Sequence, residues 1–260
     1  MSGWLRGWPV PSVATGHLVK LGIISDVHGN IEALDAVVRS LRDKGATRFI
    51  CCGDIVGYGP DPNRCIETIR GMHCTCVAGN HDYVVAGSVP IRGFSSAAAS
   101  AALWTRNQLP ESSRLYLENL PLARSEESLL VVHSSPSAPD AWEYVLTLRA
   151  AAAEMGHYPG GVCVVGHSHQ PLAVERLPGR SARRIREDTF NIRPDAKYFI
   201  NAGSVGQPRD GDARACCLLF DEDTQTMAFL RVPYDIPAVQ SKIRAAGLPA
   251  YLASRLEDGR

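Results

Sequence analysis

The sequence has no long apolar run and no excess of charge of either sign. No stretch approaches the roughly 20 consecutive apolar residues of a membrane-spanning helix, so a membrane partner is not expected. The 27 basic side chains are matched by 27 acidic ones, which gives no broad attraction for nucleic acid and predicts no stable nucleic-acid binding. The arginines between Arg176 and Arg186 form one local basic stretch, for which a solvated loop is the simpler explanation.

The sequence also lacks the marks of a secreted protein. Residues 1–17 have no continuous apolar core of a signal peptide and are predicted to be a disordered extension, unless the start has been assigned too early. The eight cysteines show no disulfide framework, because the adjacent pairs Cys51–Cys52 and Cys216–Cys217 lie in apolar runs. The segment Cys74–Cys76 lacks the C-x-x-C spacing of a structural zinc site. These features predict a reducing, cytoplasmic location.

What the sequence does contain is a repeated strand–helix rhythm. An apolar strand is predicted at Leu18–Ile24, and Asn30 is suited to cap the amphipathic helix that follows. A second strand at Thr47–Cys52, a helix at Pro62–Ile69 and a third strand at Thr75–Ala78 come next. Strands joined through helices in this way form right-handed crossovers, so we expect a mainly parallel first sheet.

The middle and the C-terminal half depart from this rhythm. Helices are predicted at Phe94–Leu109, at Glu111–Asn119 and, interrupted near Gly247, at Ile236–Leu256. Six short strands are expected at Leu129–His133, Val162–Val165, Leu172–Arg176, Tyr198–Asn201, Ala215–Phe220 and Thr226–Val232. Short strands in close succession favour hairpins, so the second sheet should be mixed or antiparallel. The predicted fold class is α/β, a four-layer αββα sandwich of two mixed sheets flanked by helices, formed as one domain by residues 18–260.

Polar residues stand at the ends of five of the predicted strands. They are Asp26 and His28 after the first strand, Asp54 after the second, Asn80 and His81 after the third, His133 at the end of the fourth, and His167 and His169 after the fifth. The carboxyl ends of strands in an open α/β sheet converge on one crevice, so we expect these side chains to meet. Without His81 they provide two carboxylates, four imidazoles and one amide oxygen. This mixed set suits Mn, Fe, Zn, Ni or Co better than Ca or Cu(I).

A pair of metal ions explains this set of residues best. Asp54 can bridge two ions about 3.5–4 Å apart, as two-metal hydrolases require. Together such ions lower the pKa of a shared water to give hydroxide near neutral pH, and they neutralise the charge that develops on a phosphoryl group. Each segment alone has a simpler explanation, such as a turn after a strand or, for His133, a satisfied core histidine. Five such segments in this order do not fit chance agreement.

These segments resemble the calcineurin-like metallophosphoesterase superfamily. The matching motifs are SDVHGN (Ser25–Asn30), CGDIVGYGPDPN (Cys52–Asn63), AGNHD (Ala78–Asp82), VVHSSP (Val131–Pro136) and VGHSHQP (Val165–Pro171). The family usually has Thr where this chain has Ser168. The segment Asn201–Ala215 further resembles bacterial members described as diadenosine tetraphosphatase-like or protein phosphatase-like.

The resemblance implies a role for each polar residue. It assigns Asp26, His28 and His169 to one metal, Asn80, His133 and His167 to the other, and Asp54 to both. His81 would not bind metal but would stand over the scissile phosphate, steady its charge and protonate the leaving oxygen. Asp82 is expected to orient His81. A metal-bound hydroxide would then attack in line, without a Ser or Cys nucleophile.

The substrate is expected to be selected at the rim of this site. Tyr58 and Arg209 are candidate rim residues, and Arg209 could contact phosphate, although a surface turn is its simpler explanation. Trp142 and Tyr144 could stack on a nucleobase, with packing in the core as the other explanation.

The predicted activity is that of a phosphoesterase with two divalent transition-metal ions, Mn before Fe, Ni, Zn or Co, acting on nucleotide or other small phosphoesters. A protein serine/threonine phosphatase and a non-catalytic scaffold of the same fold are the alternatives. The scaffold is disfavoured because His81 and all seven ligand positions are present.

Overall fold

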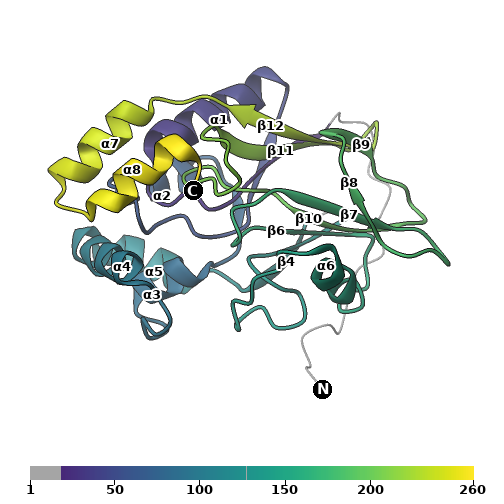
Figure 1. Ribbon diagram of the computed structural model, residues 1–260, viewed down its shortest axis with the longest axis horizontal. Coiled ribbons are helices and arrows are strands. Elements are labelled where there is room, and N and C mark those ends of the chain that lie inside the picture. The colour runs from purple at the N-terminus through teal and green to yellow at the C-terminus, as the bar shows by residue number, and fades with distance from the viewer. Residues whose placement is uncertain (1–18, 127) are drawn as a thin grey trace.

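The described chain consists of two six-stranded sheets that lie face to face with helices on both outer sides (Figure 1). The structure is a computed structural model that describes residues 19–126 and 128–260. The predicted extension, residues 1–17, lies outside the described residues. The four-layer αββα sandwich that the sequence predicts is confirmed.

The first sheet combines strands from both ends of the described chain. Its order is β3 (Thr75–Cys76), β2 (Arg48–Cys51), β1 (Lys20–Ile24), β11 (Ala215–Asp221), β12 (Thr226–Val232) and β9 (Thr189–Asn191). Strands β1, β2 and β3 are parallel, as the strand–helix rhythm predicts, whereas β11, β12 and β9 run antiparallel to their neighbours. The prediction of a mainly parallel first sheet is therefore only half right. β11 is apolar on both faces and takes a central place beside β1 instead of joining the second sheet.

The second sheet is mixed, as predicted. Its order is β4 (Ala123–Glu126), β5 (Leu129–Val132), β6 (Val162–Val165), β10 (Lys197–Asn201), β7 (Leu172–Arg176) and β8 (Arg183–Ile185). β5, β6 and β10 are parallel, and the outer pairs are antiparallel. The sequence did not predict β4, β8 or β9, because these short strands are polar or exposed and carry little hydrophobic signal.

Eight helices occur in the described residues. They are α1 (Ile31–Asp43), α2 (Pro62–Gly71), α3 (Asn80–Ala86), α4 (Ser96–Gln108), α5 (Glu111–Glu118), α6 (Leu148–Glu154), α7 (Ile236–Ala245) and α8 (Ala250–Asp258). The Asn30 side chain caps α1 by accepting a hydrogen bond from the Ala33 N–H at 3.1 Å. The sequence did not predict α3 and α6, each only seven residues long. Within the described ranges, no helix has the length and apolar content needed to cross a bilayer.

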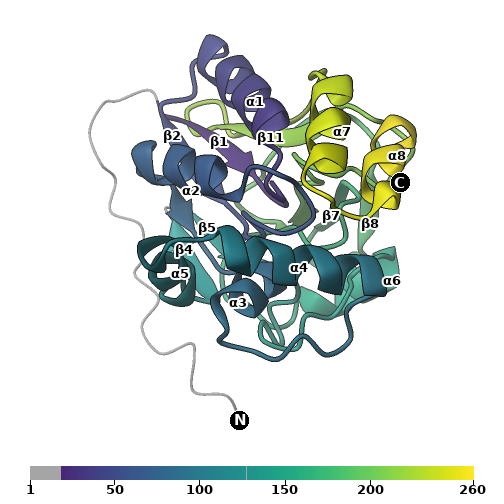
Figure 2. The ribbon, with the colours of Figure 1, turned by 90° about the vertical axis from the view of Figure 1, so that its left-hand side faces the viewer.

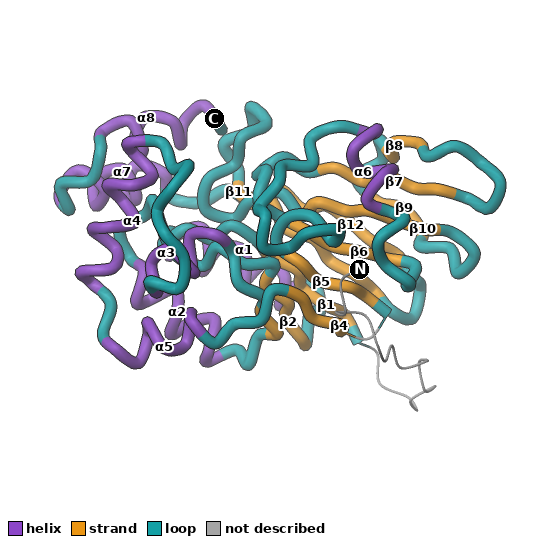
Figure 3. The backbone as a smooth tube through the Cα atoms, turned by 90° about the horizontal axis from the view of Figure 1, so that it is seen from below, coloured by secondary structure: helices purple, strands orange, loops and turns teal. Residues whose placement is uncertain are grey.

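Apolar side chains fill the spaces between the layers. Figure 3 shows the strands of these layers in orange and the helices in purple. Ile23 of β1, Val164 of β6 and Phe220 of β11 belong to the core between the two sheets. Along β6 the neighbouring Cys163 instead joins the core that Met155 forms beneath α6, as the alternation of a strand requires. Burying each such aliphatic side chain stabilises the fold by about 1.5–3 kcal/mol, so the sandwich is a rigid base for its loops.

A helical cap stands at one end of the sandwich and positions the loops beneath it. It consists of α3, α4, α5, α7 and α8, and Figure 2 shows α4, α7 and α8 facing the viewer at this end. Leu252 of α8 and Val239 of α7 pack with Ala101 of α4, and Tyr58 from the loop after β2 packs against the same cluster. The cap therefore covers the end of the sheets at which the motif loops emerge.

Candidate active site

The ends of four strands bring most of the predicted ligands together. Three overlapping groups have ligand atoms within 4.8 Å of one another: Asp26, His28 and His169; His28, Asp54 and His81; and Asp54, His133 and His167. The first two strands belong to one sheet and the other two, β5 and β6, belong to the second sheet. The site is thus built across the sandwich, and Asp54 and His28 each belong to two of its groups.

The backbone at this site is held in a conformation that side chains disfavour. Five of the seven predicted ligands have left-handed backbone angles: Asp26, His28, Asp54, His167 and His169, with φ between 50° and 65°. Only nine non-glycine residues of the described chain do so, and Tyr58 and Trp142, which also border the site, are two of the others. Each such residue destabilises the fold by about 1–2 kcal/mol, so the rest of the structure must enforce these turns.

The hydrogen bonds of His28 and His169 show that their ring nitrogens face each other as lone pairs. His28 Nδ1 donates to the Val56 carbonyl oxygen at 3.0 Å, and His169 Nδ1 donates to the Gln207 carbonyl oxygen at 2.6 Å. A neutral imidazole carries one proton, so both Nε2 atoms are acceptors, yet they lie 3.0 Å apart. Asp26 Oδ1 lies 3.2 Å from His169 Nε2 as well. Two lone pairs and a carboxylate oxygen repel one another, and a cation among them would turn this repulsion into attraction.

The group of Asp54, His133 and His167 has the same chemistry around His133. Its Nδ1 donates to the Cys52 carbonyl oxygen at 2.7 Å, and its Nε2 has no hydrogen-bond partner in the described chain, 3.3 Å from Asp54 Oδ2. Burial alone would lower the pKa of His133, but the Asp54 carboxylate raises it to about 9, so a proton takes the position that suits a metal ion. The Asn80 Oδ1 atom is buried and likewise has no partner among the described residues. A divalent cation would take the place of that proton on His133 and would give the Asn80 oxygen a partner.

Asp54 lies where it can be shared by the group of His28 and the group of His133 and His167. His167 Nε2 donates to the Trp142 carbonyl oxygen at 2.8 Å, which leaves Nδ1 free to face Asp54 and His133. Asp54 Oδ2 lies 3.6 Å from Nε2 of His28, which is grouped with Asp26 and His169, and 3.3 Å from Nε2 of His133, which is grouped with His167. Asp54 therefore stands between the two groups, as a bridging ligand would.

Asp82 does not orient His81, and that expectation is wrong. Its buried carboxylate accepts hydrogen bonds from three backbone N–H groups, those of Asp54 at 2.8 Å, Gly79 at 3.0 Å and Val56 at 3.2 Å. Burial and the charge of Asp54 raise the pKa of Asp82 to about 8, while the N–H groups of Gly79 and Val56 act in the opposite direction. Asp82 lies in the first turn of α3, and from there it ties the loop that carries Asp54 to the start of the helix.

His81 is surrounded by rings. Tyr58 and Phe94 lie 4.5 and 4.4 Å from its ring centroid, and His28 lies 4.9 Å away. Its Nδ1 is buried without a hydrogen-bond partner in the described part of the chain. Burial lowers the pKa of His81 to about 4, so the imidazole is neutral. The ligand atom of His81 also lies within 4.8 Å of those of His28 and Asp54, so geometry alone leaves it within reach of a metal.

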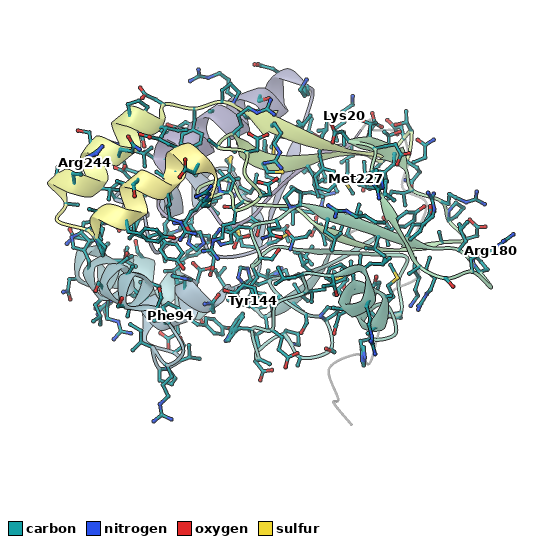
Figure 4. All side chains as sticks on the ribbon, viewed as in Figure 1. Lys20, Phe94, Tyr144, Arg180, Met227 and Arg244 are labelled. Atoms are coloured by element: carbon teal, nitrogen blue, oxygen red, sulfur yellow. The ribbon has the colours of Figure 1, made fainter. Side chains whose placement is uncertain are left out.

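The predicted rim residues differ in how they meet the site. Tyr144 is 56% exposed, and its ring is stacked on His167 with centroids 4.1 Å apart and an interplanar angle of 17°. Trp142 is half-buried and meets His133 edge-on at 6.0 Å. Arg209 donates to the Tyr58 hydroxyl at 3.4 Å and to Gln207 Oε1 at 2.9 Å. Figure 4 places Arg180 at the end of the molecule away from Phe94 and Tyr144, so the basic stretch around Arg180 is not part of this rim.

The segment that begins at Asn201, the last residue of β10, shapes the site more than the sequence indicated. Asn201 Nδ2 donates to Ser168 Oγ at 3.0 Å and to the Gly166 carbonyl oxygen, and the Ser204 hydroxyl donates to the Asp26 carbonyl oxygen at 2.8 Å. This segment fastens the Asp26 turn to the loop of His167 and His169. The sequence does hold one sign of this role, a run of small and polar residues directly after a buried strand. The backbone carbonyl groups that fix the imidazoles could not be identified from the sequence, because every residue has a carbonyl group.

Comparisons with known proteins agree with this architecture. The calcineurin-like phosphoesterase superfamily domain matches residues 19–225. The chain is 38% identical over 244 residues to the uncharacterized protein MJ0912 of Methanocaldococcus jannaschii. This alignment covers 92% of this chain and 98% of the relative. It is also 38% identical to a metallophosphoesterase from Sphaerobacter thermophilus, whose crystal structure superposes with a TM-score of 0.82 over 94% of this chain and 100% of that chain.

A third comparison concerns the fold alone. The hypothetical protein PH1004 from Pyrococcus horikoshii OT3 is 21% identical and superposes with a TM-score of 0.77 over 94% of this chain and 99% of that chain. The matched family domain spans all five motif loops and most of both sheets. The chain is therefore a hydrolase that acts on phosphoesters, and it belongs to the calcineurin-like phosphoesterase superfamily.

Proposed function

We propose that this chain is a dinuclear-metal phosphoesterase that hydrolyses nucleotide or other small phosphoesters. In this proposal Asp26, His28 and His169 hold one ion, Asn80, His133 and His167 hold the other, and Asp54 is shared. The observation that carries the proposal is the pair of facing His28 and His169 lone pairs, 3.0 Å apart, with Asp54 between this group and the group of His133 and His167. The mixed nitrogen and oxygen donors favour Mn, Fe, Ni, Zn or Co.

The chain's own residues prepare the site for the reaction. Two divalent ions, when bound, lower the pKa of water and neutralise phosphoryl charge. The Cys52, Val56, Gln207 and Trp142 carbonyl groups fix the tautomer of each imidazole, so the ligands need not reorganise. His81 steadies the phosphoryl oxygens and donates a proton to the leaving oxygen. Because its pKa is low, His81 is neutral in the free protein and must acquire this proton from solvent or substrate. The negative charge of a bound substrate beside the ring favours that protonation.

The rim supports a small substrate with an aromatic part. One face of the Tyr144 ring is packed on His167, and the side chain is 56% exposed, so the ring can receive a nucleobase beside the metal ligands. Trp142 is less suited, because it is half-buried against His133 and Tyr83. A protein phosphatase remains the alternative, and a preference for phosphopeptides would favour it.

The first test is hydrolysis by metal-loaded protein. Purified protein is stripped of metal, reconstituted with Mn, Fe, Ni, Zn or Co, and assayed with bis(4-nitrophenyl) phosphate and 4-nitrophenyl phosphate, while its metal content is measured by mass spectrometry. We expect two ions per chain, release of nitrophenolate, and loss of activity on chelation that added metal restores. Stoichiometric metal without hydrolysis of either ester would contradict the proposed mechanism and favour the non-catalytic scaffold.

A further inference from the structure

Three cationic side chains line a cavity at the end of the molecule away from the active site. They are Arg176 at the end of β7, Arg180 in the turn after β7 and Lys197 at the start of β10, and the cavity has a volume of about 380 Å³. Figure 4 shows Arg180 far from Phe94 and Tyr144, whose rings pack on His81 and His167 of the proposed active site. A cavity of this size can hold a small molecule.

Two of these cations, Arg176 and Lys197, lie side by side. They are directly opposite each other on the antiparallel strands β7 and β10. Lys197 Nζ donates to the Met155 carbonyl oxygen at 3.0 Å, and Arg176 Nη2 donates to the same oxygen at 3.3 Å. Because both charged groups are within hydrogen-bond distance of one atom, they are close to each other. Like charges directly opposite each other destabilise a sheet.

Neither member of this pair has a carboxylate partner within the described ranges. Lys197 Nζ also donates to the Tyr158 carbonyl oxygen at 2.6 Å, and Arg176 Nη1 donates to the Ala152 carbonyl oxygen at 3.5 Å. The acceptors are thus backbone carbonyl groups of α6 and of the segment after it. The end of a helix carries only about half a negative elementary charge, so more than one positive charge of the pair stays uncompensated.

The neighbouring carboxylates are engaged by more exposed arginines. Asp195, which also lines the cavity, accepts two hydrogen bonds from the exposed Arg193 at 3.0 and 3.1 Å. Glu175 of β7 is paired with the exposed Arg183 at 2.7 Å. Half-buried charges gain more from a partner than exposed charges do, yet here the half-buried pair is the one without a carboxylate. An anion in the cavity would supply the missing negative charge.

We propose that Arg176, Arg180 and Lys197 form a phosphate-binding site, remote from the active site, for free phosphate or the phosphate group of a small molecule. A phosphate dianion matches the uncompensated charge of the pair, and guanidinium presents parallel donors that fit phosphate oxygens. Lys197 uses two of its three N–H donors on carbonyl groups and Arg176 uses two of its five, so both have donors left for a ligand. The site needs neither the metal ions nor the reaction of the proposed function.

The test follows binding at the site itself by NMR. The reporters are the backbone amide signals of Gly160, Gly161 and Gly179, which line the cavity. Zinc-loaded protein labelled with ¹⁵N is titrated at constant ionic strength with inorganic phosphate, with phenylphosphonate, which has no ester bond to hydrolyse, and with acetate. We expect saturable shifts of the reporters with the first two and none with acetate, while phosphate bound at the proposed metal centre moves other signals. Tighter binding of phenylphosphonate would identify a phosphorylated small molecule as the ligand, and tighter binding of inorganic phosphate would identify free phosphate.

Substitutions then assign the binding to the three cations. Arg176→Gln and Lys197→Gln should each weaken binding about tenfold or more, the scale of one charge-assisted hydrogen bond. Arg180→Gln should weaken it about threefold, as expected of an exposed charge, and it tests the site even if the other two variants fail to fold.

Arg39 on α1 provides the matched control, because it is exposed and removing it changes the net charge by the same amount. Arg39→Gln should keep the wild-type affinity, and thermal melting should show which variants are folded. The site would be overturned by reporters that do not shift in tens of millimolar phosphate, by equal shifts with acetate, or by an affinity unchanged in every folded glutamine variant of the three cations. These outcomes do not depend on hydrolysis, so they leave the proposed function standing.

Discussion

The floor of the active site and its rim are held by different means. The floor, meaning the two carboxylates and the imidazoles of the proposed ligands together with His81, is at most 5% exposed, and backbone carbonyl groups fix four of its rings. On the rim, Tyr144 is 56% exposed and rests on His167 through a ring contact. Under the proposed function, the reaction would depend on buried residues that the whole fold keeps in place, whereas the choice of substrate would depend on exposed side chains of the rim.

The largest effect is expected from the floor residue that joins the two metal groups. Asp54→Asn keeps the shape of the side chain but removes the charge that faces both His28 and His133. We expect metal content to fall below two per chain and kcat/KM to fall by about 10³-fold or more, since the proposed mechanism needs both ions. Mass spectrometry of bound metal and assays with an aryl phosphodiester measure the two quantities.

Asp43→Asn is the matched control for this change, because Asp43 is an exposed carboxylate at the end of α1. It should leave both quantities as in the wild type. Two tightly held metals in Asp54→Asn would show that the bridge is another residue. The two metal groups of the floor would then not depend on Asp54.

The next effect separates chemistry from metal binding on the floor. His81→Ala should lower kcat by about 10²–10⁴-fold, the range for a general acid. The loss should be smaller for esters with a good leaving group such as nitrophenolate, because these need little protonation. Both metals should stay bound, and the exposed His157 provides the control His157→Ala. Lost metal would make His81 a ligand, which its distance to His28 and Asp54 permits, and equal losses for all leaving groups would leave charge stabilisation as its role.

A smaller effect is expected from Gly79, which supports the floor but is not one of the proposed metal ligands. A Cβ atom at Gly79 would collide with the Asp54 carboxylate and backbone, so Gly79→Ala should displace Asp54. A displacement of about 1 Å can lower activity by about 10²-fold, and overpacking of this kind destabilises a fold by about 1–3 kcal/mol. Gly71 has open space around its Cβ position, so Gly71→Ala is the control. A wild-type melting temperature and activity in Gly79→Ala would show that the floor can yield.

The same division explains what the sequence could predict. The floor was predictable, because strand ends converge and Asp, Asn and His at such ends have few structural uses. Asn30 was correctly identified as a cap, since capping depends on local chemistry. The place of β11 beside β1 was missed because strand pairing is decided by contacts far apart in the chain. Asp82 was misassigned for the same kind of reason: a carboxylate next to His81 in sequence faces three backbone N–H groups in space.

The smallest effect is expected at the rim, and it tests whether substrate choice resides there. Tyr144→Ala removes the exposed ring on His167. If the ring stacks on a base, a contact of about 1–3 kcal/mol is lost, so kcat/KM for nucleotide esters should fall about tenfold. Nitrophenyl phosphates should be spared, and Leu146→Ala, an exposed change in the same loop, should affect neither. Trp142→Ala should lower activity on both substrates, because this ring packs on His133 of the floor. A phosphopeptide preferred over every nucleotide tested would refute base stacking and favour the protein-phosphatase alternative, since a peptide needs no aromatic platform beside the proposed metal ligands.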